Sequence, residues 1–178
     1  FGGFNKIEFG SERVFYVHPV TISSQKLQWL QKHLMLFFTG FSRNASDIAA
    51  EQIRKTPEKK TELKVMGQMV DEAISILNKD SDDIRGFGEL LHESWKIKRS
   101  LTNVISTKDI DHIYDAARQA GAIGGKILGA GGGGFMLLFA EPEIQWKIKE
   151  KLEGLVYVPF SFEDLGSQVI MYSTQDLV

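Results

Sequence analysis

Glycine is concentrated in one short segment, KILGAGGGGFMLLFA, at residues 126–140. Gly129 and the run from Gly131 to Gly134 leave the main chain bare just before an apolar stretch. Glycine costs backbone entropy on folding and brings no side-chain packing, so the segment must gain from a close approach of its backbone. The bare peptide N–H groups can bind an anion such as phosphate. Alternatively, two backbones simply touch in a crowded hairpin.

Established glycine-rich motifs do not account for this segment. Gly129, Gly131 and Gly134 fit G-x-G-x-x-G, but the dinucleotide-binding version continues into a helix, whereas residues 135–139 (FMLLF) are typical of a strand. A P-loop is excluded because Ile127 follows the lysine where serine or threonine belongs. The other signatures of protein kinases are missing. The segment is therefore predicted to be a strand–loop–strand unit.

Lys98 is a second candidate for binding chemistry. In the helix expected over about residues 82–102, it falls inside the apolar arc, next to Phe87 and Leu91. A lone ammonium group is costly to bury. Either the stem of Lys98 packs while its charge reaches water, or the charge faces an anion in a cleft.

Arg43 is a third candidate, at a predicted strand-to-helix junction in Gly40-Phe41-Ser42-Arg43-Asn44. Backbone donors at a helix start attract anions, and a guanidinium group beside them adds a bidentate grip. The alternative is an exposed arginine in an ordinary helix cap. The four histidines and the acidic residues near 80–83 have no metal-ligand spacing, so no metal site is predicted on this chain.

The elements that must position these residues follow from apolar periodicity and turn residues. Ser24 and Thr107 are the expected N-caps of the helices at 24–32 and from 107 onward. The predicted order is β-rich, then α-rich, then ββαββ, which is an α+β fold. Strands are expected at residues 4–9, 13–17, 34–38, 125–129, 135–140, 156–161 and 167–173, and helices at 24–32, 44–55, about 63–77, 82–102, 107–121 and 142–152.

Composition restricts the class of protein. The 178 residues carry a formal net charge of -2, with lysine and arginine scattered, so a nucleic-acid partner is not expected. Apolar runs stay below the ~20 residues of a membrane span, so no membrane partner is expected. The absence of cysteine is typical of a cytoplasmic protein. The chain begins at Phe1 within a predicted strand, which suggests a fragment or a processed product.

Taken together, residues 126–134 (KILGAGGGG) resemble the third signature motif of the GHMP family of small-molecule kinases. Within that family, three segments resemble the branch that acts on heptose phosphates. These are FGGFNKIEF at the start, FFTGFSRNASDIAAEQ and LLHESWKIKRSL. The resemblance implies that residues 1–42 are a remnant of an N-terminal kinase domain. It also implies that residues 43–178 are the C-terminal domain, with ferredoxin-like ββαββ elements and packed helices.

The resemblance also implies roles. Gly129 to Gly134, with Ala130, would support the phosphate-binding loop for ATP. Gly2, Gly3, Arg43 and Lys98 would contact a phosphorylated sugar. The activity implied is transfer of phosphate from ATP to the anomeric hydroxyl of D-glycero-D-manno-heptose 7-phosphate, in nucleotide-heptose biosynthesis.

The resemblance leaves parts of such a kinase unaccounted for on this chain. The family's catalytic aspartate is expected upstream of Phe1, and the ligands of Mg²⁺ outside these residues, so the chain alone is expected to be inactive. Its expected partners are the N-terminal kinase half and the sugar phosphate, with a homodimer possible. A kinase for a fucose-like or galactose-like sugar, or a non-catalytic ligand-binding or dimerisation module, remains an alternative.

Overall fold

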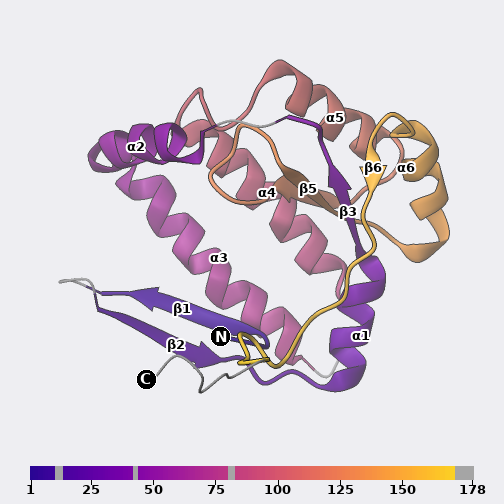
Figure 1. Cartoon of the computed structure of the whole chain (residues 1–178), viewed down its shortest axis with the longest axis horizontal. Coiled ribbons are helices and arrows are strands. Elements are labelled where there is room, and N and C mark those ends of the chain that lie inside the picture. The colour runs from indigo at the N-terminus through magenta and orange to yellow at the C-terminus, as the bar shows by residue number, and fades with distance from the viewer. Residues whose placement is uncertain (11–13, 42–43, 80–82, 171–178) are drawn as a thin grey trace, which may run out of the picture. The chain divides into compact units, whose positions relative to one another are not determined.

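The computed structural model describes residues 1–10, 14–41, 44–79 and 83–170. The chain divides into two compact units, one of residues 1–22 with residues from 161 onward, and one of residues 23–160. The elements, most of which are labelled in Figure 1, are β1 (Asn5–Phe9), β2 (Phe15–Pro19), α1 (Ser24–His33), β3 (Leu34–Phe38), α2 (Ala45–Lys55), η1 (Thr56–Glu58), α3 (Lys60–Asn78), α4 (Arg85–Leu101), α5 (Lys108–Gln119), β4 (Gly124–Ile127), β5 (Phe135–Phe139), η2 (Pro142–Ile144), α6 (Gln145–Lys151) and β6 (Val156–Tyr157).

The first unit contains an antiparallel hairpin. Strands β1 and β2 pair from Asn5 opposite Pro19 to Phe9 opposite Phe15, which confirms the two predicted strands. Residues 11–13, which join the two strands, lie outside the described residues. A strand predicted at 167–173 is wrong over residues 167–170 and lies outside the described residues beyond them. Val169 and Ile170 look like strand residues in the sequence, but they are 84% and 95% exposed and pair with no strand.

The second unit is built on a four-stranded antiparallel sheet with the order β4-β5-β3-β6. Its central strands, β3 and β5, are continuous apolar runs, and they pair from Leu34 opposite Phe139 to Phe38 opposite Phe135. Such runs are typical of strands that are covered on both faces, and most of their residues are buried. Strand β4 forms one edge of the sheet, beside the glycine-rich segment.

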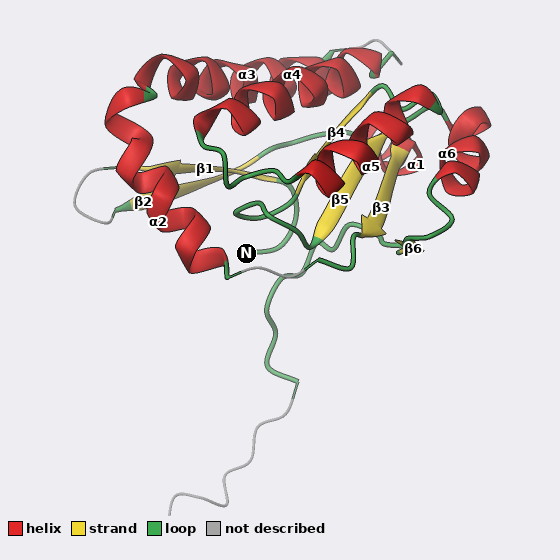
Figure 2. Cartoon of the chain, turned by 90° about the horizontal axis from the view of Figure 1, so that it is seen from above, coloured by secondary structure: helices red, strands yellow, loops and turns green. Residues whose placement is uncertain are grey.

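Helix α4 lies against β4 through two glycines. A Cβ atom at Gly124 would lie 1.9 Å from the Gly88 carbonyl oxygen, and one at Gly88 would lie 2.4 Å from the Phe139 ring. Neither position can hold a larger residue without movement of the helix or of the side chains beside it, because real Cβ contacts are much longer than this. Figure 2 shows α3 and α4 running side by side, with α4 next to the sheet.

The hydrophobic core joins the sheet to α4, α5 and α6. Trp95, Tyr114 and Ile127 belong to it and are almost completely buried. Thr107 caps α5 as predicted, because its side chain accepts a hydrogen bond from the Ile110 N–H. For α1 the cap is Ser23 rather than the expected Ser24.

Helix α3 forms where the apolar periodicity predicts it, but its apolar face is only partly covered. Leu77 is buried, whereas Leu63 and Val70 are 37% and 45% exposed. Periodicity therefore identified the helix correctly, while the extent of its burial depends on which elements lie beside it.

Strand β3 lies in the sheet of the second unit, between β5 and β6. The compact units thus divide the chain at other positions than residue 42. The assignment of residues 1–42 to an N-terminal kinase domain stays a prediction.

Candidate functional site

The glycine-rich segment forms a loop between β4 and β5, as the sequence predicts. Gly129 and all four glycines from 131 to 134 have positive φ angles, from 74° to 153°, which other residues adopt only with strain. Gly131 and Gly133 are also sterically restricted. A Cβ at these positions would lie 2.7 Å from the Ile105 carbonyl oxygen and 2.5 Å from that of Phe41, respectively. Close backbone approach therefore explains part of the glycine run.

Two other glycines of the loop, Gly129 and Gly134, have free space around them. An added Cβ at Gly129 or Gly134 would meet nothing within 4 Å, so only their φ angles require glycine. The loop is thus crowded where it touches neighbouring loops and bare elsewhere. Backbone packing therefore applies at Gly131 and Gly133, and anion binding by the loop stays a prediction.

Hydrogen bonds fix the loop mainly through its carbonyl oxygens. Lys98 Nζ donates to the Gly129 oxygen at 2.7 Å, and Gln52 Nε2 donates to the Ala130 oxygen at 2.8 Å. The Gly134 oxygen accepts from both the N–H and the hydroxyl of Thr39.

The N–H groups of the loop are used less completely. Those of Gly132 and Gly134 donate to the carbonyl oxygens of Ile105 and Phe41. Within the described parts of the chain, the N–H groups of Ala130, Gly131 and Gly133 have no acceptor. Free N–H groups of this kind can bind an anion.

Lys98 lies on α4 and is half-buried, as its place in the apolar arc predicts. Its ammonium group neither extends freely into water nor meets a carboxylate among the described residues; it binds the Gly129 carbonyl. Burial, followed by the charge of Lys126, lowers the pKa of Lys98 to about 8. Burial also lowers the pKa of Lys126, which extends from β4.

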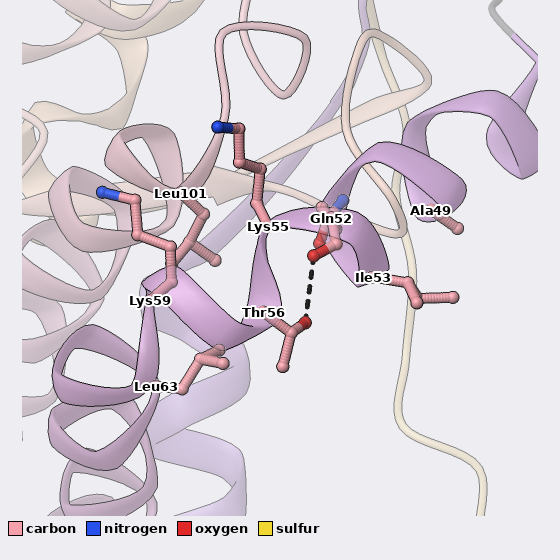
Figure 3. Close-up of a pocket in the computed structure, with 8 residues that line it drawn as sticks. All are labelled: Ala49, Gln52, Ile53, Lys55, Thr56, Lys59, Leu63 and Leu101. Carbon is pink, nitrogen blue, oxygen red and sulfur yellow. Dashed lines mark hydrogen bonds between the residues drawn. The ribbon is translucent and has the colours of Figure 1, made fainter.

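A pocket of about 270 Å³ lies beside the loop, between α2, η1, α3 and the end of α4. Figure 3 shows Gln52, the residue that also holds Ala130, on one wall, with Lys55 and Lys59 along the other side. Both lysines already pair with carboxylates, those of Glu58 and Glu62. The pocket therefore adds room beside the loop but no unpaired charge from these two lysines.

The other predicted site residues belong to the first unit or lie outside the described residues. Gly2 and Gly3 belong to the first unit, where a Cβ on Gly2 would lie 2.3 Å from the Asp164 carbonyl oxygen. Their role beside a sugar stays a prediction. Arg43 lies outside the described residues, whereas Asn44 next to it is the N-cap of α2.

Sequence reasoning missed Lys126 and Gln52. A lysine in a short strand otherwise made of glycine and isoleucine was the available signal for Lys126. Gln52 carried no signal, because its role depends on where α2 ends up in space.

The described residues offer no group of three histidine or carboxylate side chains able to hold a metal ion. No chemical step is therefore assigned to a metal on these residues. In the same part of the chain, no helix combines the length and apolar character that crossing a bilayer requires.

Comparison with known proteins identifies this arrangement. The family described as "GHMP kinases C terminal" matches residues 72–155, which include α4, α5, β4, the glycine loop and β5. D-glycero-alpha-D-manno-heptose 7-phosphate kinase of Campylobacter jejuni is 33% identical over 172 residues, which cover 93% of this chain and 50% of that protein. Mevalonate kinase of Thermococcus gammatolerans is 33% identical over 140 residues, covering 75% of this chain and 41% of that protein.

A solved structure supports the same fold. Mevalonate kinase of L. major, in complex with R-mevalonate, superposes with a TM-score of 0.72 at 16% identity, over 94% of this chain and 51% of that one. The chain thus spans about half the length of the kinases it matches. Its α+β fold, its glycine loop and its similarity to both kinds of kinase lead to one conclusion: the chain carries the C-terminal domain of the GHMP kinases.

Proposed function

We propose that this chain is part of an ATP-dependent kinase for a phosphorylated sugar, with D-glycero-D-manno-heptose 7-phosphate as the substrate and its anomeric hydroxyl as the acceptor. The observation that carries the proposal is the half-buried Lys98 beside the glycine loop, without a carboxylate partner among the described residues. A sugar phosphate brings a second anionic group, remote from the reacting hydroxyl, that can serve as this partner. The similarity to a heptose 7-phosphate kinase over 93% of the chain supports the same substrate.

The roles follow from what phosphoryl transfer requires. This chemistry depends on positioning and on neutralising the charge of the phosphate oxygens. We assign the distal phosphate of the sugar to Lys98 and Arg43, and the sugar itself to the segment of Gly2 and Gly3. The glycine loop, Gly129 to Gly134, backs the loop that holds the ATP phosphates. The catalytic base is assigned to a residue outside this chain, because none of its residues matches the family's catalytic aspartate.

Mevalonate is the main competing substrate. The mevalonate kinase of T. gammatolerans is as identical to this chain as the heptose kinase is, although over fewer residues. Mevalonate carries a carboxylate, which a lysine also binds. A free fucose-like or galactose-like sugar lacks such an anion and would leave Lys98 without a substrate partner. A non-catalytic module would need no substrate at all.

A substrate panel separates these possibilities. The full-length protein that contains this chain is incubated with ATP and, in turn, heptose 7-phosphate, free heptose, fucose, galactose and mevalonate, and ADP release is followed. We expect turnover to be fastest with heptose 7-phosphate. If mevalonate or a free hexose is turned over faster than heptose 7-phosphate, the assignment of heptose 7-phosphate as the substrate is wrong. Absence of ADP release with every compound would contradict the kinase proposal and favour the module.

A further inference from the structure

Lys126 shares a face of β4 with Gly124. Residues two apart on a strand point to the same side of the sheet, and Gly124 faces α4 at the Gly88 carbonyl. The side chain of Lys126 therefore starts on the side of β4 that α4 covers. Lys98 comes from α4 itself, ten residues beyond Gly88, and reaches Gly129 just after β4 ends. The two lysines thus approach the same end of the α4–β4 contact.

The ammonium groups of Lys98 and Lys126 carry like charges, which repel each other. Each ammonium group is partly desolvated, and the charge of Lys126 acts on Lys98. Among the described residues, neither lysine forms an ion pair, although Lys55, Lys59 and Lys96 do. Two partly buried like charges without a counter-charge are unfavourable, so the arrangement is suited to an anion that binds both.

The nearby loop adds hydrogen-bond donors. The Gly129 and Ala130 oxygens already accept hydrogen bonds from Lys98 and Gln52. Free N–H groups of the same loop remain at Ala130, Gly131 and Gly133, as far as the described residues extend. Positive charge and free N–H groups together are the features of a phosphate site.

We propose that Lys98 and Lys126 form a two-lysine site for a phosphate monoester beside the glycine loop, which makes Lys126 a further substrate-positioning residue. The assignment of that phosphate to the sugar rests on the proposed function; the binding of a phosphate by the pair does not. Lys126 had no role in the sequence-based assignment.

The test measures phosphate binding without catalysis. Inorganic phosphate is titrated into the protein at pH 7.5 and low salt by calorimetry, for wild type and for Lys98→Met, Lys126→Met and Lys96→Met. Methionine keeps much of the length of the side chain and removes the charge. Each of the first two changes should raise the Kd for phosphate about tenfold or more, because a hydrogen bond to a charged group is lost. Lys96 pairs with Glu93 on the same helix, so its replacement is the matched control.

Three outcomes would contradict the proposed two-lysine phosphate site. They are unchanged binding in Lys126→Met, equal weakening in Lys96→Met, or no binding of phosphate by the wild type. If Lys126→Met fails to fold, the ammonium groups of the wild type are followed by NMR instead. Bound phosphate should raise the pKa of both Lys98 and Lys126, and a shift of Lys98 alone would contradict the proposal.

Competition identifies the molecule that carries the phosphate. Heptose 7-phosphate should displace inorganic phosphate and should bind more weakly to both lysine variants, whereas ADP should bind all variants equally. A loss of ADP affinity in both variants would instead place a nucleotide phosphate there and overturn the assignment to the sugar. Lysine-dependent phosphate binding without any kinase turnover would leave the site intact and contradict only the proposed function.

Discussion

Lys98 shows how the environment of one residue changes its chemistry. Its apolar stem lies in the hydrophobic arc of α4, and its ammonium group meets a carbonyl oxygen and the field of a second lysine. Both burial and like charge disfavour the protonated form, so its pKa falls from 10.5 to about 8. A bound phosphate would act in the opposite direction and stabilise the charged form.

The lowered pKa of Lys98 predicts a pH dependence of stability. Between pH 8 and 10.5 the unfolded chain holds a proton on Lys98 that the folded chain has released. The contribution of Lys98 to the free energy of unfolding therefore rises with pH across this window. The free energy of unfolding of wild type and of Lys98→Met is measured with denaturant at several pH values. We expect the value for wild type to increase relative to that for Lys98→Met as the pH rises. A constant difference between the two proteins would contradict the lowered pKa, and Lys96→Met serves as control.

Alanine substitutions at the loop glycines should lower the free energy of unfolding by different amounts. Gly129→Ala places a side chain at φ 74° in open space, which should cost about 1–2 kcal/mol of strain. Gly131→Ala and Gly133→Ala add contacts with the backbones of Ile105 and Phe41 and should cost about 3 kcal/mol. Thermal or denaturant unfolding measures the order. Equal effects at all three positions would mean that close packing does not restrict the loop.

At the scale of elements, the contact of α4 with β4 positions the site. Lys98 is carried by the helix, whereas Lys126 and the glycine loop belong to the strand and its continuation. Gly88 and Gly124 let the two backbones approach. The distance between the lysines therefore depends on residues that have no chemical role of their own.

Replacement of two helical glycines by alanine should change the free energy of unfolding in opposite directions. Gly88→Ala would force a methyl group onto Phe139 and Ile123, and we expect it to lower the free energy of unfolding by about 1–3 kcal/mol. Gly67 in α3 has nothing within 4 Å of an added Cβ, so Gly67→Ala should raise stability by up to about 1 kcal/mol through helix propensity. Denaturant titration of both variants is the check. A neutral Gly88→Ala would show that α4 can move away from β4 without cost.

The sequence predicted the elements best where the signal was local. Strand β3 was expected at residues 34–38 and lies there, because a five-residue apolar run has few other solutions. The Thr107 cap and the amphipathic arc around Lys98 were equally visible. Val169 and Ile170 were misread because a strand needs a partner, and apolar residues alone do not provide one.

The candidate site was harder to predict than the elements. Lys98 could be singled out because helical periodicity exposes a charge on an apolar face. Lys126 and Gln52 gain their places only through the contacts of β4 and α2 with distant segments. Sequence spacing carries little information about such contacts, which bring together residues far apart in the chain.

At the scale of the whole molecule, we propose that the chain supplies one part of a larger enzyme. It spans about half the length of the kinases that it matches, and its described residues contain no metal-binding group. In the proposed enzyme, this chain supplies cations and a bare loop, while the base and the metal ligands come from elsewhere. The preference for a phosphorylated substrate is then the property that this chain should control.

The most direct test is the ratio of kcat/KM for heptose 7-phosphate to that for free heptose, measured with the full-length protein as wild type, Arg43→Ala, Lys98→Met and Lys96→Met. We predict that the wild type strongly prefers the phosphorylated sugar. Arg43→Ala and Lys98→Met should each reduce the ratio about tenfold or more by raising KM for the phosphorylated sugar, and Lys96→Met should leave it unchanged. An unchanged ratio in both Arg43→Ala and Lys98→Met would contradict the account.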